Sequence, residues 1–184
     1  MTTVPERLLP STGRVSRRQG CVALAALVLM PARANVPHPG TQLRGRGTLR
    51  FLGLAIYEAR LWTLPTFEAA SYASQPFTLE LVYARGLDGA AIVERSLLEM
   101  RRQEAFDPAR EPAWRALMQQ AFPDTAAGDR LAGANDGDGG VRFLHNGRVT
   151  AQARDADFAR LFFGIWLSPR TSEPGLRRAL LAMS

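Results

Sequence analysis

Arg50 and Tyr57 lie in one segment of the sequence and together could bind an anion. Arg50 stands among apolar neighbours, and a buried guanidinium is costly unless an anion pairs with it. A guanidinium can hold a carboxylate through two parallel hydrogen bonds, and a tyrosine hydroxyl could donate another. The pair therefore indicates a site for a small amphipathic acid. In the structural alternative, Arg50 pairs with an acidic side chain or reaches an edge, and Tyr57 packs in the core.

Other site chemistries find little support among the residue types. There is one cysteine, and His38 and His145 are the only histidines, so neither a cysteine-based zinc site nor a Ser-His-Asp triad is indicated. Residues 135–140 superficially resemble a calcium loop but lack oxygen ligands at the required spacing, which favours a β-turn. Gly45-Arg46-Gly47 lacks the third glycine of a phosphate-binding loop. We expect no metal or cofactor.

The net charge of +6 is concentrated at the start of the chain. Residues 1–34 hold five arginines and one glutamate, whereas residues 35–184 hold 18 arginines and 16 acidic residues. Because basic and acidic residues nearly balance in residues 35–184, this part of the chain lacks the concentrated positive charge of a nucleic-acid-binding surface. We therefore expect no nucleic-acid partner, and the sequence identifies no protein partner.

Residues 1–34 have the organisation of a cleavable export signal. Arginines precede an unbroken apolar run over residues 21–30, and Ala32 and Ala34 form an Ala-x-Ala site with cleavage after Ala34. Ten apolar residues are too few to span a bilayer, so no stable transmembrane anchor is expected. Arg17-Arg18 leaves the twin-arginine route open. We expect an exported, periplasmic protein whose single domain covers residues 35–184.

Alternation of apolar residues predicts the strands that would carry the site. Residues 48–62 indicate one long strand or two consecutive strands, buried on both faces at the centre, with Gly53 at a bulge or bend. Asn146-Gly147 is a strong hairpin signal. Further strands are expected at residues 77–85, 129–134, 141–145 and 148–153.

Helical spacing predicts helices between these strands, with Asp88 and Asp155 as N-caps. In the helix after Asp88, Arg95 and Glu99 are expected to face water. The stripe of Phe158, Phe162 and Trp166 is typical of a core rather than of a cofactor site. The expected helices cover residues 88–102, 112–122, the segment after Asp155, and 175–183. The elements predict an α+β domain in which an antiparallel sheet packs against a layer of helices.

Three segments, by their order and spacing, resemble the chalcone isomerase-like family in its bacterial exported branch. They are residues 47–62 (GTLRFLGLAIYEARLW), 77–85 (FTLELVYAR) and 158–168 (FARLFFGIWLS). The resemblance covers about residues 41–182. It implies the same α+β fold, with a ligand cleft between sheet and helices, and plant members of the fold bind fatty acids through an arginine and a tyrosine.

The resemblance also bears on catalysis. Chalcone isomerases surround their substrate with an arginine, a threonine, a tyrosine and an asparagine. The last three positions match Leu52, Ile92 and Glu99, and the arginine matches Arg50, Arg46 or Arg44. Without a hydroxyl at these positions, the cyclisation chemistry has no support.

The sequence therefore predicts a non-catalytic protein that binds a small amphipathic carboxylate, such as a fatty acid, at Arg50 and Tyr57. Two alternatives stay open. One is a ligand-free interaction or structural domain of the cell envelope. The other is an isomerase- or lyase-type enzyme.

Overall fold

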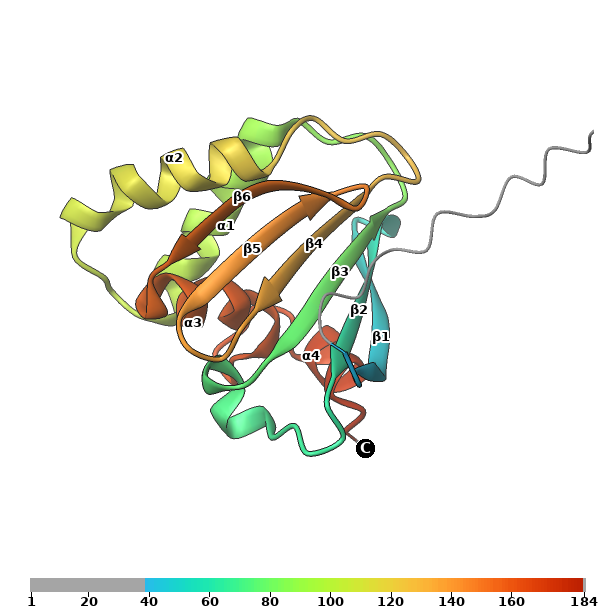
Figure 1. Cartoon of the computed structure of the whole chain (residues 1–184). Helices are drawn as coiled ribbons and strands as arrows, with labels where there is room; N and C mark the ends of the chain where they lie inside the picture. The colour runs from blue at the N-terminus through green and yellow to red at the C-terminus, as the bar shows by residue number, and fades with distance from the viewer. Residues whose placement is uncertain (1–38, 184) are drawn as a thin grey trace, which may run out of the picture. The chain divides into compact units, whose positions relative to one another are not determined.

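The structure, a computed structural model, describes residues 39–183, so the expected export signal and its cleavage point lie outside the described residues. Residues 39–183 form one antiparallel sheet of six strands in sequential order (Figure 1). The strands are β1 (Gln42–Phe51), β2 (Leu54–Thr63), β3 (Phe77–Tyr83), β4 (Arg130–Asn135), β5 (Gly140–His145) and β6 (Arg148–Arg154). With the helices described below, this sheet confirms the predicted α+β class.

The alternating segment at residues 48–62 folds as two consecutive strands. β1 and β2 meet at a tight turn whose central residues, Leu52 and Gly53, have positive φ angles of 48° and 81°. Two strands were among the predicted outcomes, and that form is confirmed. The predicted burial of both faces at the centre is wrong, because the chain reverses there and leaves Leu52 and Leu54 exposed.

The β5–β6 hairpin confirms the Asn146-Gly147 signal and repeats the same turn geometry. Asn146 and Gly147 have φ angles of 49° and 81°. The Asn146 side chain accepts a hydrogen bond from the Arg130 N–H and donates one to Asp129, both 2.9 Å long. Positive φ at both central positions favours Asn-Gly. The β1–β2 turn places a leucine where this turn places an asparagine.

The helices begin where the sequence predicts their caps. The Asp88 carboxylate accepts a hydrogen bond from the Ala91 N–H (2.9 Å), and Asp155 accepts one from the Phe158 N–H (3.1 Å). Each satisfies a helix-terminal N–H that lacks a partner within the helix. The helices are α1 (Gly89–Gln103), α2 (Glu111–Ala121), α3 (Ala156–Leu167) and α4 (Pro174–Leu181), with 3-10 turns η1 (Ala69–Ser74) and η2 (Pro108–Arg110).

The core lies between the sheet and the helical layer, with α1, α3 and α4 behind the sheet in Figure 1. Alternate residues of β3 point into it. From α3, Phe158, Phe162 and Trp166 are buried as predicted. Phe162 packs edge-on against Phe143 of β5, with ring centroids 5.1 Å apart. This aromatic layer fixes α3 at the centre of the domain.

Two glycines let α4 pack directly on β1. A Cβ atom on Gly45 would lie 2.5 Å from the Leu180 carbonyl oxygen, and one on Gly47 would lie 2.8 Å from Leu176 Cδ1. The Arg44 Nε–H also donates to the Leu181 carbonyl oxygen (3.3 Å). Gly45-Arg46-Gly47 is therefore a packing motif, where the helix backbone approaches the strand too closely for any side chain.

Candidate ligand-binding site

A cavity of about 290 Å³ lies between the inner face of the sheet and helices α1, α3 and α4. Its walls are mostly apolar and come from separate elements of the fold. They include Leu49, Leu81, Ile92, Phe143, Phe162 and Leu176. The volume lies near the lower end of the range of about 300–1,000 Å³ typical of small-molecule sites. The cavity can therefore enclose a small apolar ligand or part of a longer one.

Tyr57 and Trp166 place polar groups inside this apolar cavity. The Trp166 Nε1–H donates a 3.0 Å hydrogen bond to the Tyr57 hydroxyl, joining α3 to β2. Tyr83 packs edge-on against the Tyr57 ring, with centroids 5.8 Å apart. Burial raises the pKa of Tyr57 above its usual range and outweighs the opposing effects of the Trp166 hydrogen bond and the Arg95 charge. The hydroxyl therefore stays protonated at neutral pH and can donate a hydrogen bond.

Arg95 and Glu99, one helical turn apart on α1, form a charged pair that also lines the cavity. Their Nη2 and Oε1 atoms are 2.7 Å apart. The Glu99 side chain is only 5% exposed, whereas that of Arg95 is 61% exposed. Glu99 Oε1 nevertheless has no donor in hydrogen-bond geometry among residues 39–183. Arg95 thus stands at the exposed rim of the cavity, paired with Glu99 through Nη2.

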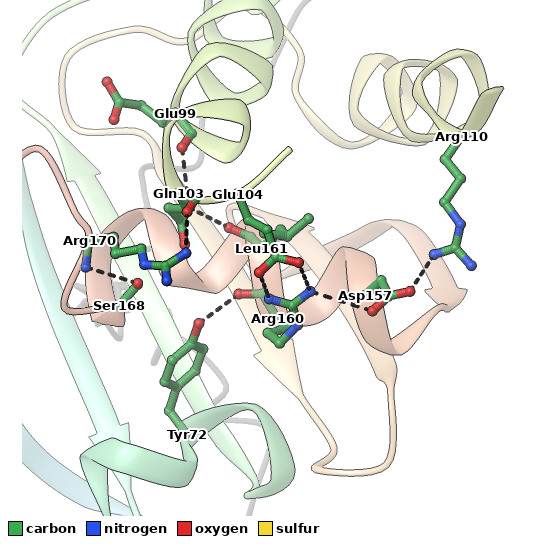
Figure 2. Close-up of polar contacts among 10 residues, drawn as sticks. All are labelled: Tyr72, Glu99, Gln103, Glu104, Arg110, Asp157, Arg160, Leu161, Ser168 and Arg170. Atoms are coloured by element: carbon green, nitrogen blue, oxygen red, sulfur yellow. Dashed lines mark hydrogen bonds and ion pairs between the residues drawn. The ribbon is translucent and has the colours of Figure 1, made fainter. Parts of the chain in front are cut away.

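A buried amide holds α1 in register with α3 beside this pair. Gln103 Nε2 donates to the Leu161 carbonyl oxygen (2.9 Å) and to that of Glu99 (3.3 Å), as Figure 2 shows. Tyr72 donates to the Arg160 carbonyl oxygen of α3 (2.8 Å). Gly164 leaves the space that both side chains occupy, because its Cβ would lie 2.7 Å from the Tyr72 hydroxyl. These contacts fix the turn of α1 that carries Glu99.

Ion pairs at the surface extend the same network. Arg160 binds the Glu104 carboxylate at 2.9 Å and approaches Asp157 at 3.6 Å, and Asp157 binds Arg110 at 2.7 Å (Figure 2). The hydrogen bond from Arg160 lowers the pKa of Glu104. Exposed pairs of this kind contribute little to stability individually, about 0–1 kcal/mol. Their effect is to orient the ends of α1 and α3.

Of the two predicted site residues, the structure places only Tyr57 at the cavity. Arg50 is exposed near the β1–β2 turn, where its Nη1–H donates to the Gly53 carbonyl oxygen (3.2 Å). The apolar neighbours of Arg50 lie at a hairpin tip rather than in a core, so its expected position in a cavity is wrong. The two alternatives also lie outside the cavity: Arg46 is exposed on β1, and Arg44 binds α4.

Sequence reasoning missed Arg95 and misplaced Glu99. Both were expected to face water, yet Glu99 is buried and both line the cavity. A signal was present: Ser96, Glu99 and Gln103 recur at helical spacing on the side of α1 that carries its apolar residues. Buried polar residues that share a helix face with a core stripe are unusual and indicate either a polar network or a site.

No group of three or more histidine, cysteine, aspartate or glutamate side chains in residues 39–183 is arranged to hold a metal ion. No helix within the same range has the length and apolar character needed to cross a membrane.

Comparison with known proteins identifies the family. The chalcone isomerase-like family matches residues 26–182. This chain belongs to that family. Among solved structures, it is similar to a fatty-acid binding protein of Arabidopsis thaliana, with a TM-score of 0.62 and 12% identity, over 83% of this chain and 90% of the plant chain. At that identity the likeness shows the shared fold. No curated protein matches the sequence.

Within this chalcone isomerase-like fold, the positions matched to family catalytic residues do not all lie at the cavity. Ile92 and Glu99 line the cavity, on α1. Leu52 lies instead at the β1–β2 turn and is 86% exposed. The cavity thus occupies the expected place between sheet and helices, but an isoleucine and a glutamate stand where the resemblance implied a tyrosine and an asparagine.

Proposed function

We propose that this chalcone isomerase-like protein binds a small amphipathic carboxylic acid, such as a fatty acid, without transforming it. The observation that carries the proposal is a mostly apolar cavity whose lining includes the Tyr57 hydroxyl and the Arg95 guanidinium. The apolar chain of the ligand would lie against the inner face of the sheet. The shared fold with a plant fatty-acid binding protein supports this choice by analogy.

The carboxylate-binding role expected of Arg50 passes to Arg95 in this proposal. One nitrogen of Arg95, Nη2, faces Glu99, so the other N–H groups of its planar fork are available to a ligand at the rim. Tyr57 accepts a hydrogen bond from Trp166, and within residues 39–183 no acceptor takes its own hydroxyl hydrogen. That hydrogen can be donated to the carboxylate.

Glu99 and Glu173 also line the cavity and oppose the binding of an anion. Both repel a carboxylate, so the acid binds only where Arg95 compensates them. The apolar chain supplies the larger share of affinity, at about 0.8 kcal/mol per buried CH₂. We therefore expect affinity to rise about fourfold per added CH₂ until the cavity is filled, and then to level off.

The test is calorimetric titration of the purified protein with saturated fatty acids of increasing length and with their methyl esters. Arg95→Gln should weaken binding of the acids about tenfold or more, because it removes a charged hydrogen-bond partner, and should leave ester binding unchanged. Arg50→Gln is the matched control and should bind the acids like the wild type. If no acid of any length binds, the ligand-free interaction domain replaces this proposal.

The proposal includes export to the periplasm, in the bacterial exported branch of the family. It rests on the arginines, the apolar run and the Ala-x-Ala site of residues 1–34. Mass spectrometry of the protein from the periplasmic fraction should give a chain that begins at Asn35. Replacing both Arg17 and Arg18 by lysine should abolish export if the twin-arginine route is used, and should leave it intact otherwise.

A further inference from the structure

The tip of the β1–β2 hairpin holds three large apolar side chains in solvent. Phe51, Leu52 and Leu54 are 65%, 86% and 52% exposed around Gly53. The other exposed large apolar residues within residues 39–183 stand singly along the chain. A cluster of exposed apolar side chains is a feature of surfaces that meet a partner or a membrane.

The backbone of this turn is unfavourable for a leucine, so folding alone does not account for Leu52. Leu52 and Gly53 have almost the same φ angles as Asn146 and Gly147 in the β5–β6 turn. Leucine is disfavoured in the left-handed region, whereas asparagine is tolerated there and strongly preferred in such turns. Leu52 therefore has both a strained backbone and an apolar side chain in solvent. An asparagine at this position would remove both costs.

The tip also lies beside the cavity. Leu49 and Ile56, each two residues from the tip in β1 and β2, line its wall. The hairpin forms the edge of the sheet, as Figure 1 shows. An apolar ligand that leaves the cavity past these residues would reach Phe51 and Leu54 next.

The charges around the tip are basic. Arg50 is exposed and hydrogen-bonded to the turn. Arg85 is exposed where β3 ends next to β2, and the neighbouring Ala84 N–H donates to the Ile56 carbonyl oxygen (2.9 Å). The acid that follows in the chain, Asp88, is engaged as the N-cap of α1. Apolar side chains flanked by arginines fit the interface of a bilayer with anionic headgroups.

We propose that the β1–β2 tip inserts into the surface of anionic lipid bilayers. Phe51, Leu52 and Leu54 enter the boundary between headgroups and acyl chains, while Arg50 and Arg85 contact lipid phosphates. Exchange of an amphipathic acid between bilayer and cavity at this contact rests on the proposed function. The membrane contact itself does not, because it depends only on the tip.

The test is flotation of the ligand-free protein with vesicles of phosphatidylcholine alone and of phosphatidylcholine mixed equally with phosphatidylglycerol. The wild type should float with the mixed vesicles. Leu52→Asn should lower the bound fraction about tenfold or more, since it removes a buried leucine from the contact. Arg50→Gln should lower binding to the mixed vesicles about fivefold. Leu43→Asn, at the opposite end of the same hairpin, should float like the wild type.

Leu52→Asn separates this role from a structural one, because its two effects have opposite signs. It should raise Tm by about 2–4 °C while it weakens flotation. Flotation of Leu52→Asn equal to the wild type would overturn the proposal. A wild type that does not float but dimerises through the tip, with a monomeric Leu52→Asn variant, would also overturn it in favour of a protein interface. Arg95→Gln should float normally even if it binds no acid, which distinguishes failure of the two proposals.

Discussion

Trp166 donates its indole N–H to the Tyr57 hydroxyl, so the central helix and the second strand are joined by one hydrogen bond inside an apolar cavity. The two residues are 109 positions apart in the chain. The bond satisfies the indole donor and leaves the hydroxyl hydrogen for a ligand. It therefore serves both the stability of the empty protein and the polarity of the site.

Removing this hydroxyl should destabilise the fold. Tyr57→Phe leaves the Trp166 N–H without its acceptor, and a buried unpaired donor costs about 1–3 kcal/mol. Urea unfolding should show that loss. A double-mutant cycle with Trp166→Phe should give a coupling energy of about 1 kcal/mol, whereas additive effects would mean that the hydrogen bond contributes nothing.

At alkaline pH, ionisation of its three tyrosines should destabilise the folded protein. Burial raises the pKa of Tyr72 to about 12 and the pKa values of Tyr57 and Tyr83 beyond their usual range. The unfolded chain loses these protons first, near pH 10, so stability is fully present below that pH and falls as pH rises toward 12 and beyond. The slope should reach about 1.4 kcal/mol per pH unit for each tyrosine.

The amino-acid composition simplifies the assignment of this alkaline titration to the tyrosines. Every basic residue is an arginine, so no lysine ionises in the same window. Denaturant unfolding followed across the alkaline range, with tyrosinate absorbance recorded in parallel, should show the decline. Tyr72→Phe should make the decline shallower. Stability that stays constant up to about pH 12 would contradict the burial of these hydroxyls.

A methyl group at Gly164 should destabilise the domain despite its helical position. In Gly164→Ala the new Cβ would collide with Gln103 Oε1 and the Tyr72 hydroxyl. Both side chains hold α3 by donating to its carbonyl oxygens, Gln103 through Nε2 and Tyr72 through its hydroxyl. Overpacking of this kind costs about 1–3 kcal/mol, more than the helix propensity of alanine returns. Thermal unfolding measures the difference.

Gly175 supplies the matched control for this substitution. It also lies in a helix, α4, but the nearest atom to its added Cβ is 4.0 Å away, on Arg178. Gly175→Ala should therefore be neutral or slightly stabilising. Equal losses in the two variants would mean that helix geometry, rather than the crowding around Gly164, determines the cost.

Local patterns predicted the elements well, because caps and strand alternation depend on neighbours in the sequence. Asp88, Asp155 and Asn146 each have the contacts expected of their types. The site was harder to predict from the sequence. The apolar neighbours of Arg50 suggested that it is buried, but these neighbours lie at an exposed hairpin tip. Glu99 shows the converse: its polarity suggested solvent, but the packing of α1 on α3 encloses it. The cavity depends on how distant elements meet, which no local pattern contains.

The docking of α4 on β1 across two glycines has a kinetic consequence. The Arg44–Leu181 hydrogen bond closes a loop of 137 residues, and contacts of such separation form late because the chain must first lose the entropy of the whole loop. Leu176 of α4 is part of the cavity wall. We therefore expect the binding cavity to be completed late in folding. An enclosed ligand should slow the release of α4, so that occupancy lengthens the lifetime of the native state.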